Sequence, residues 1–93
     1  MNAVLRDEAM PRLARGVRLR EDRVRGGWNL LAPERVLKAN PVAVAVLQLC
    51  DGSRTFAALV DALTETFAAD RARIENDAAA LLSDLAAKRM VDL

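Results

Sequence analysis

The chain has 93 residues, of which 53% are hydrophobic and 29% are charged, so it can form one folded domain and is too short for a multidomain enzyme. It contains no His, no Tyr and a single Cys, Cys50. These counts exclude an intrachain disulfide, a His/Cys metal cage and any catalytic mechanism that needs an imidazole. We therefore expect a non-enzymatic domain with no metal site and no cofactor.

The charge is distributed unevenly along the chain. Residues 1–40 carry a net charge of +4 and residues 41–93 a net charge of −3, which sum to +1. Seven of the fourteen basic residues lie between positions 6 and 25. Among them, Arg18, Arg20 and Arg25 are candidates for steering an acidic partner electrostatically. The simpler alternative is an ordinary solvated strand face.

The first residues lack the features of a targeting segment. Residues 1–10 include Arg6, Asp7 and Glu8 and no apolar run typical of a signal peptide. No later stretch reaches the roughly 18 apolar residues of a membrane span. We therefore expect a cytoplasmic protein, with residues 1–10 as a flexible tail and residues 11–93 as a single domain.

Three strands are expected in the first half of the chain. Apolar and basic residues alternate over positions 17–25, interrupted at Glu21-Asp22, as in a strand with one buried face. Gly26-Gly27 predicts a turn, residues 28–32 form the next apolar run, and Pro33-Glu34 breaks it. A third strand then runs from Arg35 to Ala39. Its Lys38 and the nearby proline are typical of a sheet edge.

Three helices are expected after residue 39. Asn40 and Pro41 suit the cap and first position of a helix that ends near Cys50. Thr55 caps a second helix, whose apolar stripe has spacings of three and four: Phe56, Leu59, Val60, Leu63 and Phe67. Asp70 caps a third, with the stripe Ile74, Ala78, Leu81, Leu82 and Leu85. The sequence thus predicts an α+β domain in which a three-strand antiparallel meander precedes three helices, resembling a winged helix-turn-helix.

Several short motifs, in their order and spacing, resemble the PqqD family. The most specific are LLAPE at residues 30–34 and L-x-LCDG at residues 47–52, followed by Thr55. The other matching positions are Arg15-Gly16, Arg18-Leu19, Asp22, Asn40, Ile74, Asp77 and Leu85. The resemblance covers residues 11–93. Two segments depart from the family pattern: Lys88-Arg89-Met90, where the family usually has a glycine, and Trp28-Asn29, which is usually more aliphatic.

The resemblance implies a peptide-binding domain of pyrroloquinoline quinone (PQQ) biosynthesis. It implies that the domain binds the ribosomally made precursor peptide PqqA and presents it to the radical-SAM enzyme PqqE. The iron–sulfur clusters and S-adenosylmethionine then belong to the partner enzyme. We expect the peptide to extend the sheet at the edge of the third strand and to pack against the third helix. The candidate contacts are Arg35, Val36, Leu37, Lys38, Ala39, Ile74, Ala78, Leu81 and Leu82.

Two other functions fit the same predicted elements. A winged-helix DNA-binding protein would place the third helix in the major groove, but this helix carries four acidic residues against four basic ones, which disfavours contact with phosphates. A structural dimerisation module would pair two copies through the exposed strand edge, giving a homodimer. We expect no partner among nucleic acids or membranes.

Overall fold

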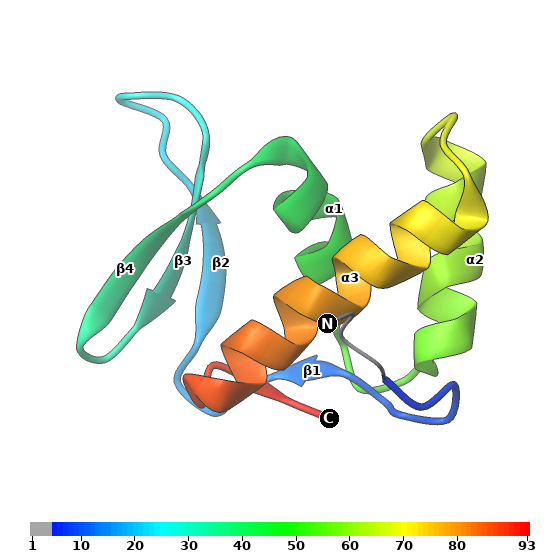
Figure 1. Ribbon diagram of the computed structural model, residues 1–93. Coiled ribbons are helices and arrows are strands. Elements are labelled where there is room, and N and C mark those ends of the chain that lie inside the picture. The colour runs from blue at the N-terminus through cyan, green and yellow to red at the C-terminus, as the bar shows by residue number, and fades with distance from the viewer. Residues whose placement is uncertain (1–4) are drawn as a thin grey trace.

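Two small sheets and three helices make up residues 5–93, the part of the chain that the computed structural model describes (Figure 1). In chain order the elements are β1 (Arg12–Leu13), β2 (Arg18–Glu21), β3 (Trp28–Ala32), β4 (Arg35–Ala39), α1 (Pro41–Gln48), α2 (Phe56–Thr66), α3 (Arg71–Ala87) and β5 (Val91–Asp92). The prediction of a three-strand meander followed by three helices is confirmed. The short strands β1 and β5 were not expected.

The larger sheet has the order β2-β3-β4, with neighbouring strands antiparallel. Leu30 of β3 lies opposite Leu19 on one side and Leu37 on the other, and it is fully buried against the helices. The strand expected over residues 17–25 ends at Glu21 because Asp22 forms a turn. Its Oδ1 accepts hydrogen bonds from the backbone N–H groups of Val24 and Arg25, both at 3.0 Å.

Local capping explains where α1 and α2 begin. The side chain of Asn40 accepts a hydrogen bond from the Ala43 N–H at 2.8 Å, and Thr55 Oγ1 accepts one from the Ala58 N–H at 3.2 Å. Asp70 occupies the same position before α3, but its side chain makes no capping hydrogen bond. Asp70 therefore holds the predicted N-cap position, but the prediction that its carboxylate caps α3 is wrong. Its carbonyl oxygen accepts from the Ile74 N–H at 3.0 Å.

The end of α3 is closed by a Schellman motif. The Met90 N–H donates to the Leu85 carbonyl at 2.9 Å, and the Arg89 N–H donates to the Ala86 carbonyl at 3.0 Å. This geometry requires a left-handed residue at position 89, and Arg89 has φ of +62°. Glycine adopts this conformation without steric cost, whereas arginine is strained in it.

Strands β1 and β5 join the two ends of the domain. Arg12 lies opposite Asp92, and Leu13 lies opposite Val91. The loop between α1 and α2 also contacts the chain next to β1, because the Gly52 N–H donates to the Pro11 carbonyl at 3.0 Å. Gly52 has φ of +77°, and a Cβ atom here would lie 3.3 Å from the Arg12 side chain, so this position suits glycine alone.

Residues 5–10 contact α2 and the core. The Phe56 N–H donates to the Ala9 carbonyl at 2.7 Å, and the Ala57 N–H donates to the Asp7 carbonyl at 3.1 Å. Leu5 and Ala9 pack against buried residues. Of the tail expected over residues 1–10, positions 1–4 lie outside the described residues, and positions 5–10 supply backbone acceptors to the first turn of α2.

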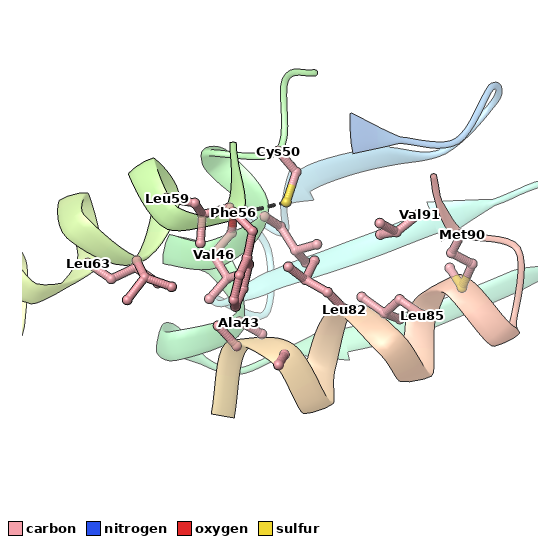
Figure 2. Close-up of a cluster of buried hydrophobic side chains, with 14 of the residues drawn as sticks. Ala43, Val46, Cys50, Phe56, Leu59, Leu63, Leu82, Leu85, Met90 and Val91 are labelled. Carbon is pink, nitrogen blue, oxygen red and sulfur yellow. Dashed lines mark hydrogen bonds between the residues drawn. The ribbon is translucent and has the colours of Figure 1, made fainter. Parts of the chain in front are cut away.

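The core lies where the three helices meet the inner face of the sheet. Figure 2 shows Phe56, Leu59 and Leu63 of α2 beside Val46 of α1, with Leu82 and Leu85 directed from α3 toward them. All six side chains are buried. Phe67 and Leu81 belong to the same apolar stripes but are only half-buried. These two stripes are therefore not entirely core.

Candidate functional site

Within residues 5–93, strand β4 forms a free edge of the larger sheet. The Asp22 N–H donates to the Gly27 carbonyl at 2.8 Å, which marks this pair as hydrogen-bonded in the β2–β3 ladder. Hydrogen-bonded and non-hydrogen-bonded pairs alternate along an antiparallel ladder. Following the register into β4, Arg35, Leu37 and Ala39 direct their backbone groups toward β3. Val36 and Lys38 direct theirs away from the sheet, where another strand can pair with them.

A groove of about 270 Å³ lies between this edge and α3. Figure 1 shows the arrangement, with the larger sheet on one side of the molecule and α3 running toward it from α2. The buried apolar residues of the groove are Leu30, Ala43, Leu47 and Leu85. Half-buried Leu37, Ala39 and Leu81 also line it, together with the exposed charged residues Lys38, Asp84 and Lys88. The groove is thus apolar inside and charged at its margin.

The structure distributes the predicted α3 contacts over three environments. Leu81 is half-buried and lines the groove beside β4. Leu82 is 0% exposed and packs in the core, so it has no surface to offer a ligand. Ile74 and Ala78 line a separate hollow nearer the start of α3, where Ile74 is half-buried and Ala78 is 2% exposed. The apolar residues expected to form one binding face of α3 are therefore divided among the groove, the core and the separate hollow.

Sequence reasoning missed the residues that complete the groove. Asp84, Leu85 and Lys88 follow Leu81 at spacings of three, four and seven, which place them on the same side of a helix. That spacing was readable from the sequence. The contribution of Ala43 and Leu47 was not readable from the sequence, because it depends on how α1 packs against β4 and α3.

The three predicted steering arginines lie outside the groove. Arg18 and Arg20 alternate with Leu19, which faces the core, so their side chains project from the opposite face of the sheet. Arg25 lies in the β2–β3 turn. All three are exposed, and within residues 5–93 none of them forms an ion pair. Their positive charge therefore faces solvent, away from the groove beside β4.

Cys50 has the properties of a core residue. It is 5% exposed, and its thiol donates to the Val46 carbonyl at 3.3 Å. Burial, and secondly the negative charge of Asp51, raise the pKa of Cys50 to about 12, so the reactive thiolate is strongly disfavoured. Residues 5–93 contain no group of three His, Cys, Asp or Glu side chains that could hold a metal ion. No helix in this part of the chain is long and apolar enough to cross a bilayer.

Comparison with known proteins gives a consistent family assignment. A family model described as coenzyme PQQ synthesis protein D (PqqD) matches residues 27–91. A PqqA binding protein of Rhodopseudomonas palustris (strain BisB5) is 46% identical over 87 residues, which cover 94% of this chain and 85% of the relative. A PqqA binding protein of Xanthomonas axonopodis pv. citri (strain 306) is 43% identical over 93 residues, the full length of both chains.

Two solved structures share the fold. The solution structure of the PqqD truncation of Methylobacterium extorquens PqqCD matches with a TM-score of 0.82 at 44% identity, covering 98% of this chain and 97% of that one. It is described as a functional, stand-alone RiPP recognition element, which agrees with the prediction of a non-enzymatic domain. The crystal structure of PqqD from Xanthomonas campestris matches with a TM-score of 0.60 at 39% identity, covering 97% and 100%. The chain belongs to the PqqD family.

Proposed function

We propose that this chain binds the precursor peptide PqqA of PQQ biosynthesis and does not itself catalyse a reaction. The names of the relatives support the identity of the peptide. The observation that carries the binding mode is the free edge of β4 beside an apolar groove of about 270 Å³. An edge strand offers unpaired N–H and C=O groups to an extended chain, and a neighbouring groove can select its side chains.

In this mode the peptide forms a fourth strand that pairs with the backbone of Val36 and Lys38. Successive side chains of a strand point to opposite faces, so every second peptide side chain faces the helices and the others face solvent. The inward side chains would contact Leu37, Ala39 and Leu81. Five residues of β4 span roughly 17 Å at about 3.3 Å per residue, which leaves room for two or three inward side chains. We therefore expect alternating apolar residues in the bound segment.

The charged margin of the groove favours an acidic residue in the peptide. Lys88 Nζ lies 2.9 Å from Asp84 Oδ2, so these two charges largely satisfy one another. Lys38 is exposed, and no carboxylate of residues 5–93 forms an ion pair with it. A peptide carboxylate next to Lys38 would supply the missing partner.

A proline substitution at the strand edge tests this binding mode. Lys38→Pro removes an outward N–H without removing a hydrogen bond of the sheet, and proline is tolerated at such edge positions. We expect binding of PqqA to weaken at least about tenfold, as measured by calorimetric titration. Glu21→Pro is the matched control, because the backbone of Glu21 faces outward from the opposite edge, on β2. Equal affinities of the two variants would contradict strand addition at β4.

We also propose that the bound peptide is presented to the radical-SAM enzyme PqqE. Edge pairing would hold a short segment and leave the rest of the peptide free to enter an active site. The iron–sulfur clusters and S-adenosylmethionine then belong to PqqE, in agreement with the chemistry expected from the resemblance. Cross-linking turnover by PqqE should rise when wild-type chain is added to PqqA, and should rise less with Lys38→Pro. Equal turnover with the wild-type chain and with Lys38→Pro would show that presentation to PqqE does not depend on pairing at the β4 edge.

The two alternative functions have less support. Three of the four basic residues predicted for a DNA-recognition helix are in ion pairs: Arg71 with Asp61, Arg73 with Asp77 and Lys88 with Asp84. This leaves α3 little positive charge for phosphates, so we expect no salt-dependent binding to duplex DNA. A homodimer through β4 would use the same edge as the peptide. Sedimentation should then show PqqA dissociating the dimer.

A further inference from the structure

A second apolar hollow, of about 220 Å³, lies between the three helices and is not part of the groove beside β4. Its apolar lining residues are Val42, Val46, Leu63, Phe67, Ala69, Ile74 and Ala78. Because one water occupies roughly 30 Å³ of the liquid, the hollow has the volume of about seven waters. One large apolar side chain can therefore fill it.

The hollow retains apolar surface that the core does not cover. Val42 is 50% exposed, and Ile74 and Phe67 are half-buried, although all three are large hydrophobic residues. Covering such surface with an apolar group is favourable because it removes the surface from water. Among residues 5–93, the charged residues that line the hollow are Arg73 and Asp77, which form an ion pair with each other at 3.9 Å. The hollow therefore suits an apolar and uncharged group.

The hollow continues the line of the groove along the same side of α3. The α3 residues of the groove are centred about nine positions beyond those of the hollow, which corresponds to about 13 Å along the helix. On α1, Val42 and Val46 line the hollow, whereas Ala43 and Leu47 line the groove. The Val42 N–H has no hydrogen-bond partner within residues 5–93, so it can donate to a carbonyl of a peptide that runs from the groove to the hollow.

We propose that PqqA places a second apolar side chain in this hollow, four residues away from an apolar side chain held in the groove. An extended chain covers about 13 Å in roughly four residues, and side chains four apart lie on the same face. This inference rests on the proposed function, because it adds a specificity subsite to the same bound peptide. It makes the recognised segment longer than β4 alone.

Two variants and a matched control test the subsite. Val42→Glu places a charge at the hollow, and glutamate is favourable in the first turn of a helix, so α1 should persist. Val24→Glu makes the same change at a valine that is 94% exposed in the β2–β3 turn. Ile74→Ala removes apolar contact without changing charge. With calorimetric titration of PqqA, we expect Val42→Glu to weaken binding at least about tenfold, Ile74→Ala about fivefold, and Val24→Glu less than twofold.

An alanine scan of PqqA locates its matching residue. We expect two sensitive apolar positions four residues apart. Truncating one of them should weaken binding to the wild-type chain but cause little further loss with Ile74→Ala, because the two changes remove the same contact. Amide NMR shifts at Val42, Phe67 and Ile74, and methyl shifts at Val42 and Ile74, should accompany binding.

The outcomes separate this subsite from the proposed function. If the wild-type chain binds no PqqA, the proposed function itself fails. If PqqA binds and shifts the signals of Leu37 and Leu81 but not those of Val42 and Ile74, the groove is occupied and the hollow is not. Wild-type affinity of both Val42→Glu and Ile74→Ala would likewise overturn the subsite while leaving strand addition intact.

Discussion

Deleting residues 1–10, so that the chain begins at Pro11, tests whether the N-terminal segment is part of the domain. The carbonyls of Asp7 and Ala9 accept the N–H groups of Ala57 and Phe56 in the first turn of α2. After the deletion, both N–H groups would lose their carbonyl acceptors and would have to bond to water. It would also expose the core surface that Leu5 and Ala9 cover.

The expected loss follows from these contacts. Each hydrogen bond contributes about 0.5–1.5 kcal/mol net. Half-burial of Leu5 contributes roughly 1 kcal/mol, since complete burial of a leucine is worth about 1.5–3 kcal/mol. The deletion should therefore lower the free energy of unfolding by about 2–4 kcal/mol. In a domain of this size, that corresponds to a decrease in Tm of about 10 °C or more.

Urea unfolding followed by far-UV circular dichroism measures this difference. Leu5→Ala should reproduce about 1 kcal/mol of the loss. Glu8→Ala is the control, because Glu8 is exposed and its ion pair with Arg6, at 3.5 Å, is solvated. A deletion that changes the free energy of unfolding by less than about 0.5 kcal/mol would refute the reasoning and favour a flexible tail.

Three further predictions concern strain, steering and pH. Arg89→Gly should stabilise the domain by about 0.5–1 kcal/mol in the same assay, because it relieves a left-handed arginine; destabilisation would show that the side chain makes a compensating contact. Arg18→Glu with Arg20→Glu should slow PqqA association in stopped-flow measurements, as should added salt, and rates insensitive to both would make these arginines merely solvated. Burial raises the pKa of Cys50 to about 12, so above about pH 9 the unfolded chain loses a proton that the folded chain keeps, and stability falls with rising pH. Denaturation at pH 8 and pH 10 should show a smaller decrease for Cys50→Ala than for the wild type.

Local sequence signals predicted the elements that depend on near neighbours. Asn40 and Thr55 cap α1 and α2 as expected, because a capping side chain reaches an N–H only a few residues away. Gly26-Gly27 and Pro33-Glu34 mark the two turns of the meander. Where two local signals competed, the prediction was wrong. The alternation over residues 17–25 favoured a strand, but the Asp22 carboxylate binds backbone N–H groups and forms a turn.

The sequence by itself therefore determined the class of the domain, the order of its main elements and the edge position of β4. Only the tertiary structure decided how the apolar stripe of α3 is used: Leu82 in the core, Leu81 in the groove, and Ile74 in the hollow. It also decided that β1 pairs with β5 and that residues 5–10 contact α2. The physical reason is that helical periodicity marks an apolar face, whereas the packing of other elements determines how much of that face is covered. Contacts between distant segments leave no local pattern, since two-residue strands and backbone carbonyl acceptors place almost no demand on side-chain identity.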